Sequence, residues 1–207
     1  MSDPPAPGPG DRQGPPPAAD LQDRQVVVAV GGGIAAYKVC TLVSRLIQRG
    51  CGVTVAMTEA GMRFVGPLTF QALTQRPVHT SLWDAPADFR PGHLSLTETA
   101  DLLVVAPATA DLIGKFAAGI ADDLVTTLMI GRDCPVLLAP AMNTRMWENP
   151  VVQRNLASLR GLGCAIVEPA EGWLACRGEG KGRMAEPEEI LQAVIDLLAR
   201  TPPRRPQ

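Results

Sequence analysis

The chain has 207 residues, a formal net charge of −2 at pH 7 and 46% hydrophobic residues. The charge is nearly balanced and no basic stripe runs along the chain, so nothing in the sequence would attract nucleic acids or anionic membranes electrostatically. Neither is expected as a partner. No apolar run approaches the roughly 20 residues that cross a bilayer. The proline-rich start, with its acidic residues, is unlike an export signal.

The cysteines argue against an oxidising location. There are five of them, scattered along the chain, and none lies in a CxxC pair. This pattern indicates neither a disulfide framework nor a metal site. A cytoplasmic location and no resident metal are therefore expected.

Disordered tails are predicted at both ends. Residues 1–23 are rich in proline, glycine and polar side chains, and residues 201–207 are similar. Such segments cannot bury enough apolar surface to fold. Residues 24–200 remain, which is enough for one domain with an ordinary core.

Between the tails, apolar strands alternate with helical patterns. In chain order, the expected elements are a strand at 25–30, a helix at about 35–49, a strand at 52–57, a short helix capped by Thr58, an irregular stretch at 77–91, a strand at 101–106, helices at 109–118 and 122–130, a strand at 135–139, a helix at about 151–160, a strand at 164–167 and a helix at 187–198. Strands that are apolar throughout and separated by helices predict a doubly wound α/β fold, with a parallel sheet covered on both faces.

Small and hydroxyl-bearing residues follow the first three strands. The glycines at 31–33, the segment 58–60 and the segment 107–111 each stand where a helix begins. Helix N-termini bind anions, and the carboxyl ends of parallel strands share one edge of the sheet. Together the three segments predict a nucleotide-like cofactor. The glycine loop alone fits neither GxGxxG nor a P-loop, and a tight turn without a ligand explains it equally well.

Two further segments indicate a pocket. Asn143 lies between methionines and a tryptophan in residues 140–147, directly after an apolar strand. Cys176 lies beside cationic residues in a glycine-rich segment that we expect to be flexible. These surroundings favour a thiol as a thiolate or proton donor, although an idle cysteine in a disordered loop is the alternative. His93 is a plausible general base because imidazole titrates near neutral pH, whereas His79 is interpreted as a surface residue.

Five motifs resemble the homo-oligomeric flavin-containing cysteine decarboxylases over about residues 25–199. They are GGIAAYK at 32–38, HLSL at 93–96, PATAD at 107–111, PAMNTRMW at 140–147 and the strip at 176–184. The resemblance implies a flavodoxin-like, three-layer fold that binds FMN near a subunit interface and forms trimers or dodecamers. It also implies FMN-dependent decarboxylation of 4′-phosphopantothenoyl-L-cysteine to 4′-phosphopantetheine in coenzyme A biosynthesis.

The resemblance assigns roles to the matching positions. His93 would be the active-site base, Cys176 the proton donor, Asn143 the ligand of the substrate carboxylate or amide, and Met146 a wall of the pocket. The clamp over the substrate would consist of Trp173, Leu174 and Ala175. The FMN contacts would come from Gly32, Gly33, Ile34, Thr58, Ala60, Thr109, Ala110, Asp111, Leu112 and Ala141.

Two positions depart from the family pattern, and three other functions are alternatives to this one. Asp111 stands where relatives commonly have asparagine, and Arg177 stands where glycine is usual. An oxidative decarboxylase of a peptide's C-terminal cysteine would stop at the enethiol and would not need Cys176. A non-catalytic FMN-binding regulatory subunit would not need His93, Asn143 and Cys176 together. A flavin prenyltransferase relative would not be expected to carry PAMNTRMW.

Overall fold

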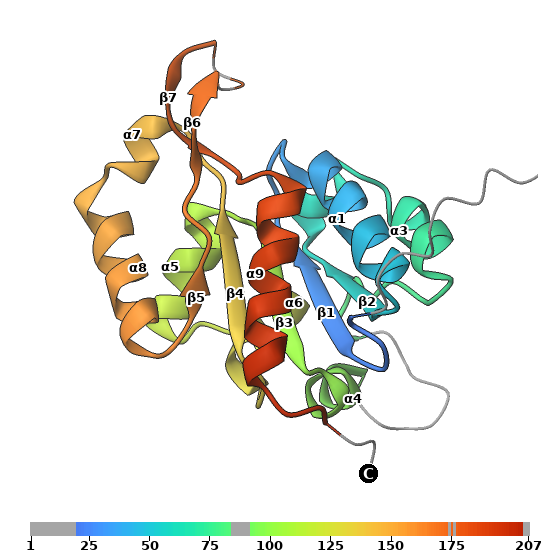
Figure 1. Ribbon diagram of the computed structural model, residues 1–207. Coiled ribbons are helices and arrows are strands. Elements are labelled where there is room, and N and C mark those ends of the chain that lie inside the picture. The colour runs from blue at the N-terminus through green and yellow to red at the C-terminus, as the bar shows by residue number, and fades with distance from the viewer. Residues whose placement is uncertain (1–19, 84–91, 174, 176, 205–207) are drawn as a thin grey trace, which may run out of the picture.

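A five-stranded parallel sheet in the order β2-β1-β3-β4-β5 runs through the molecule (Figure 1). The computed structural model describes residues 20–83, 92–173, 175 and 177–204, without the side chains of residues 92–95. The sheet strands are β1 (Gln25–Val30), β2 (Gly52–Met57), β3 (Leu102–Ala108), β4 (Val136–Pro140) and β5 (Ala165–Ile166). This strand order is that of the flavodoxin-like doubly wound fold, so the predicted fold class is confirmed.

Helices cover both faces of the sheet. The helices are α1 (Ala36–Gln48), α2 (Glu59–Met62), α3 (Pro67–Thr74), α4 (Gly92–Thr99), α5 (Ala110–Ala118), α6 (Leu124–Gly131), α7 (Thr144–Trp147), α8 (Pro150–Gly161) and α9 (Pro187–Arg200). Alternate residues of β1 belong to different cores. Val26 and Val28 pack with α1, α3 and α9, whereas Val27 and Ala29 pack with α5, α6 and α8. Burial on both faces explains why the strand reads as apolar throughout.

The predicted sheet strands and long helices are present, and the structure adds elements that the sequence did not predict. Helices α3, α4 and α7 have at most eight residues, which is too few for a clear helical stripe. The glycine-rich segment, expected to be flexible, contains β7 (Glu179–Arg183), which pairs antiparallel with β6 (Ala170–Trp173). This hairpin projects beyond the carboxyl edge of the sheet (Figure 1).

The opposite edge of the sheet is closed around Asp101, whose side chain is buried. The Asp101 carboxylate accepts hydrogen bonds from the backbone N–H groups of Gln25 and Arg204, both at 2.7 Å. Residues 201–204, which the sequence places in the C-terminal tail, thereby contact the starts of β1 and β3. Within the described residues, no helix combines the length and apolar character needed to cross a membrane.

Candidate cofactor and substrate pocket

A cavity of about 1190 Å³ opens at the carboxyl edge of the sheet. Its walls are the segments that follow β1, β2, β3 and β4, together with residues from both the base and the tip of the β6–β7 hairpin. Ligand pockets typically measure about 300–1,000 Å³, so this one has room for a cofactor and a substrate side by side.

Nearly every site residue predicted from the sequence and described in the structure lines this cavity. Asn143, Met146, Trp173 and Ala175 are among the lining residues. The predicted cofactor residues in the lining are Gly32, Gly33, Ile34, Thr58, Ala60, Thr109, Ala110, Asp111, Leu112 and Ala141. Leu174 and Cys176 fall outside the described residues, so their predicted roles stay predictions.

The glycines after β1 bring three loops together and leave backbone open toward the pocket. A Cβ on Gly31 would lie 2.3 Å from the Pro107 carbonyl oxygen, and one on Gly32 would lie 2.3 Å from the Ala60 Cβ. A Cβ on Gly33 would meet no protein atom closer than 3.5 Å. Protein packing therefore requires the first two glycines, whereas the bare backbone of Gly33 is free for a ligand to approach. This arrangement fits a flavin held against the loop.

Helix caps shape the polar surface of the pocket. The Thr58 hydroxyl accepts a hydrogen bond from the Gly61 N–H at 2.9 Å, and the Thr109 hydroxyl accepts one from the Leu112 N–H at 3.3 Å. Helix α1 has no side-chain cap. Side-chain acceptors thus satisfy only part of the N–H groups that every helix N-terminus leaves unpaired. The remaining N–H groups make this edge suited to anionic groups of a ligand.

Asn143 caps α7 and thereby fixes the orientation of its own amide. Its side-chain oxygen accepts a hydrogen bond from the Met146 N–H at 2.9 Å. Because the oxygen serves the helix, the amide presents its NH₂ donors outward. Asn143 and Met146 are both exposed, while Trp147 is buried beneath them. The geometry is that of a donor placed for a carboxylate or carbonyl.

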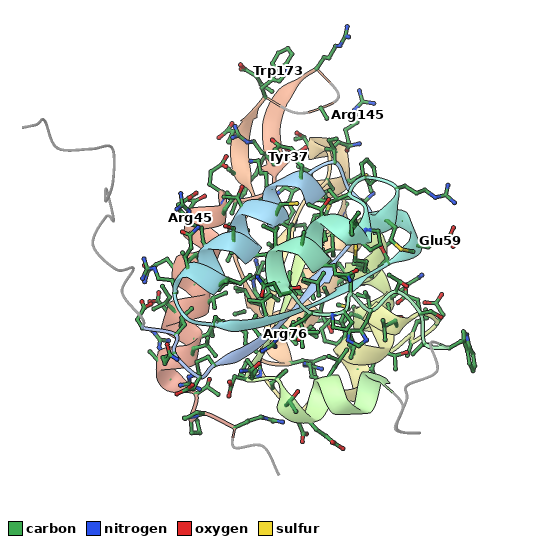
Figure 2. All side chains as sticks on the ribbon, turned by 90° about the vertical axis from the view of Figure 1, so that its right-hand side faces the viewer. Tyr37, Arg45, Glu59, Arg76, Arg145 and Trp173 are labelled. Carbon is green, nitrogen blue, oxygen red and sulfur yellow. The ribbon has the colours of Figure 1, made fainter. Side chains whose placement is uncertain are left out.

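The hairpin is attached to the loop after β4. The Met142 N–H donates to the Gly182 carbonyl at 3.0 Å, and a Cβ on Gly182 would lie 2.2 Å from the Met142 oxygen, so only glycine permits this approach. Lys181 Nζ lies 5.4 Å from the centroid of the Trp147 ring and 3.0 Å from Glu168. In Figure 2, Trp173 stands at the top of the hairpin, above the α1 end that carries Tyr37.

Two ionic clusters contribute to the lining of the pocket, and the sequence predicts neither set of ion pairs. Lys115 lies 3.1 Å from Asp122 and 3.4 Å from Asp111. The hydrogen bond between Lys115 and Asp122 raises the pKa of the lysine and lowers the pKa of that aspartate. The second cluster joins Lys38 and Arg183 to a single carboxylate, that of Glu186. The lysine is part of GGIAAYK, but nothing local in the sequence reveals its partner.

A further wall of the pocket was also missed. Residues 80–83 line it beside Thr58 and Glu59. They are placed there because His79 pairs in parallel with Ala56 at the edge of β2. The sequence predicts an irregular stretch here and a surface position for His79.

Helix α4, which carries His93, lies at the opposite edge of the sheet from the pocket (Figure 1). Leu96 of this helix and Ala100, the residue after it, pack with Val27 and Leu103, near the starts of β1 and β3. The strand β3 that separates α4 from the pocket has seven residues, which span roughly 20 Å at about 3.3 Å per residue. The side chain of His93 falls outside the described part of the chain.

Comparisons with known proteins agree with this geometry. A family model described as "Flavoprotein" matches residues 16–199. The chain is 48% identical over 172 residues to the coenzyme A biosynthesis bifunctional protein CoaBC of Bacillus subtilis, covering 83% of this chain and 42% of that protein. The chain therefore spans less than half the length of this curated relative.

Two solved structures share the fold at appreciable sequence identity. A cysteine-to-serine mutant of PPC decarboxylase, complexed with pantothenoylaminoethenethiol, matches with a TM-score of 0.76 and 32% identity, covering 84% of this chain and 97% of that chain. The FMN-dependent cysteine decarboxylase SpaF matches with a TM-score of 0.76 and 30% identity, covering 87% and 98%.

Proposed function

This chain belongs to the flavoprotein family, and we propose that it binds FMN and decarboxylates 4′-phosphopantothenoyl-L-cysteine to 4′-phosphopantetheine, a step of coenzyme A biosynthesis. One observation carries the proposal. The predicted cofactor residues from four separate strand ends line a single pocket, and the amide of Asn143 faces the same pocket. Similarity to PPC decarboxylase and to a CoaBC protein supports the choice of substrate.

The chemical roles of the cofactor and of the pocket residues follow from the residue types. FMN, when bound, supplies the two-electron oxidation and re-reduction that the substrate carbon requires. Asn143 holds the substrate carboxylate through its NH₂ donors, because its oxygen is occupied by the Met146 N–H. Met146, half exposed at the pocket wall, limits the space around the cysteine end of the substrate.

Two side chains outside the described atoms complete the proposal. His93 accepts a proton as the active-site base. Oxidation of the substrate to a thioaldehyde stabilises the carbanion left by loss of carbon dioxide, much as in a β-keto acid. Cys176 then donates a proton as the resulting enethiol is reduced. Trp173 and Ala175 flank the pocket beside the hairpin tip and cover the substrate with Leu174.

The position of α4 supports a homo-oligomeric enzyme. One chain's His93 helix lies roughly 20 Å from that chain's pocket, at the far end of β3. We therefore assign His93 to the pocket of a neighbouring subunit in a homotrimer, or in a dodecamer built from such trimers. The free thiols of Cys40, Cys51, Cys134 and Cys164 are compatible with the proposed cytoplasmic location.

Product mass tests the proposal. Purified protein is expected to carry yellow flavin and to convert phosphopantothenoylcysteine to a product lighter by one carbon dioxide. Cys176→Ser is expected to release the enethiol, which is lighter by a further two hydrogens. His93→Asn is expected to form neither product.

The same assay separates the rival functions. Enethiol as the product of the unaltered protein would favour the peptide-type oxidative decarboxylase. Absence of any carbon dioxide release from a flavin-loaded protein would refute the enzymatic proposal. A mixture of His93→Asn and Cys176→Ser subunits, reassembled together, is expected to regain phosphopantetheine formation because some pockets combine two unaltered groups.

A further inference from the structure

The buried carboxylate of Asp101 joins the end of α4 to the first strand of the sheet. Asp101 lies two residues after Thr99, the last residue of α4, and its side chain is only 1% exposed. Its backbone N–H donates to the Gln25 carbonyl, and its carboxylate accepts from the Gln25 N–H, both at 2.7 Å. Two hydrogen bonds in opposite directions therefore connect the junction between α4 and β3 to the start of β1.

The segment after α9 contacts this junction from the other side. The Arg204 N–H donates to the second carboxylate oxygen of Asp101 at 2.7 Å. The Arg24 guanidinium lies 3.6 Å from the same oxygen and donates to the carbonyls of Leu198 and Thr201, both at 2.7 Å. In Figure 1, α4 and the end of α9 lie at the end of the sheet that is opposite the hairpin. Both oxygens of the carboxylate thus have partners, and one partner belongs to the segment after α9.

Helix α4 needs this junction because packing alone supports it weakly. It has eight residues, and a helix that short is not stable without tertiary contacts. Leu96 and Ala100 pack against the sheet, but the burial of apolar surface is non-directional. A void of about 10 Å³ remains between these residues and Leu128 of α6, and atoms that line a void lose contacts on that side. The hydrogen bonds at Asp101 therefore set the direction of α4 more sharply than its packing does.

We propose that Asp101 is a positioning residue for His93, and that the Arg204 N–H holds the Asp101 carboxylate in place for this role. His93 lies in the first turn of α4, eight residues before Asp101, which is roughly 12 Å along a helix. A tilt of about 10° at the junction would move that end of α4 by about 2 Å, and a misplacement of about 1 Å can slow a reaction about 100-fold. This inference rests on the proposed function, in which His93 enters the pocket of a neighbouring subunit.

A backbone substitution tests the role of Arg204 at a distance from the pocket. Arg204→Pro removes the N–H that Asp101 accepts, because proline has none, and position 204 already follows a proline. Arg204→Ala is the matched control, since it keeps this N–H and loses only the side chain, which contacts Asp133.

The two variants are compared by steady-state kinetics and by FMN titration. We expect kcat to fall about tenfold for Arg204→Pro and less than about twofold for Arg204→Ala, with KM and FMN affinity nearly unchanged in both. The reason is that the walls of the pocket lie at the other end of the sheet, whereas α4 lies at the substituted end. A kcat equal to that of the control, or an equal loss of FMN affinity, would overturn the proposal.

Mixed oligomers show which subunit's pocket the junction serves. Asp101→Asn keeps the size of the side chain but places an NH₂ donor where an N–H now donates to oxygen. In the proposed ring each pocket joins one face of a subunit to a different face of the next, so one subunit supplies Cys176 and its neighbour supplies His93. Reassembly of Asp101→Asn with Cys176→Ser subunits is expected to restore phosphopantetheine formation to about a quarter of the unaltered rate, because roughly one pocket in four combines two intact contributions.

The second mixture has the opposite expectation. Reassembly of Asp101→Asn with His93→Asn subunits should restore no activity, because both subunits then lack a functional α4 contribution. Recovery with His93→Asn, or no recovery with Cys176→Ser, would overturn the proposal, since Asp101 would then support the pocket of its own chain. If Asp101→Asn fails to fold, the kinetics of Arg204→Pro decide, because that variant leaves the Asp101 side chain in place.

Hydrogen exchange separates this proposal from the proposed function. Amide exchange of residues 96–100, measured on the flavin-loaded protein, is expected to be about tenfold faster in Arg204→Pro and unchanged in Arg204→Ala. Unchanged exchange in Arg204→Pro would overturn the proposal even if turnover fell. If the unaltered protein releases no carbon dioxide, the proposed function fails, while the exchange of α4 still shows whether Arg204 and Asp101 hold this helix.

Discussion

Replacing Asn143 with aspartate separates its role in folding from its role in binding. Aspartate and asparagine are equally good N-caps, so the introduced carboxylate would still accept the Met146 N–H that now bonds to the asparagine oxygen at 2.9 Å. The outward-facing NH₂ donors are lost, however, and a negative charge takes their place. The substitution Asn143→Asp should therefore leave the fold intact and remove the proposed contact with the substrate carboxylate.

The two effects differ in size. A hydrogen bond to a charged group contributes about 1.5–3 kcal/mol, or about 10- to 150-fold in kcat/KM, and repulsion between carboxylates adds to this loss. We expect kcat/KM to fall at least 100-fold for Asn143→Asp, with Tm unchanged within about 1 °C. Asn143→Ala, which loses the cap as well, should cost about 1 kcal/mol of stability and about 2–4 °C in Tm for a domain of this size.

Steady-state kinetics and thermal unfolding of the flavin-loaded variants check both expectations. Turnover by Asn143→Asp within threefold of the unaltered protein would refute the donor role. A Tm for Asn143→Asp as low as that of Asn143→Ala would refute the orientation of the amide, since it would mean that the carboxylate does not cap α7.

Three further predictions concern the loop, the hairpin and a buried thiol. Gly33→Ala should leave the stability of the flavin-free protein unchanged, because the added Cβ has room in the protein, and should weaken FMN binding about tenfold in a fluorescence titration. Gly32→Ala, whose Cβ would lie 2.3 Å from Ala60, should instead lower the stability of the flavin-free protein. Arg177 has a φ of 61°, so Arg177→Gly should relieve about 1 kcal/mol of left-handed strain and slow hydrogen exchange in the hairpin, whereas Arg177→Ala should not. Burial raises the pKa of Cys51 from 9.0 to about 12. As pH rises, the unfolded state therefore loses the thiol proton before the folded state does, and the free energy of unfolding should fall between about pH 9 and 12. For Cys51→Ala, unfolding measured over this pH range should show a smaller fall in that free energy.

The sequence predicted the cofactor edge well because its signals are local. An apolar strand, a small-residue turn and a capped helix follow one another within about ten residues, and parallel strands must bring such turns to one edge. Thr58 occupies its predicted cap position, Thr109 caps the helix expected from 109, and Asn143 follows β4 as expected. Each of these features can be predicted from the sequence of a single strand–turn–helix unit.

The missed features depend on contacts between distant segments. Lys38 and Glu186 are separated by 148 positions, and no periodicity within either segment reveals their pairing. The sequence predicts a flexible segment where the hairpin lies, because glycines carry no side-chain pattern. Those glycines serve close approach instead, as Gly182 shows at Met142. Helix α4 is short, and only the assembled sheet shows that it places His93 far from its own chain's pocket.

The helix caps and the ionic clusters make the two sides of the pocket chemically different. The hydroxyl of Thr58 is used by the Gly61 N–H and the Val30 carbonyl, and the oxygen of Asn143 is used by α7. Because these side-chain oxygens already accept hydrogen bonds from helix N–H groups, the wall at the strand ends presents mainly hydrogen-bond donors to a ligand. Asp111 and Asp122 make the α5 side anionic, while Lys38 and Arg183 make the α1 side cationic. A ligand with a carboxylate at one end and a phosphate at the other would be oriented by this asymmetry, with the carboxylate at Asn143 and the phosphate near α1. A neutral peptide chain ending in cysteine would satisfy only the first of these two contacts.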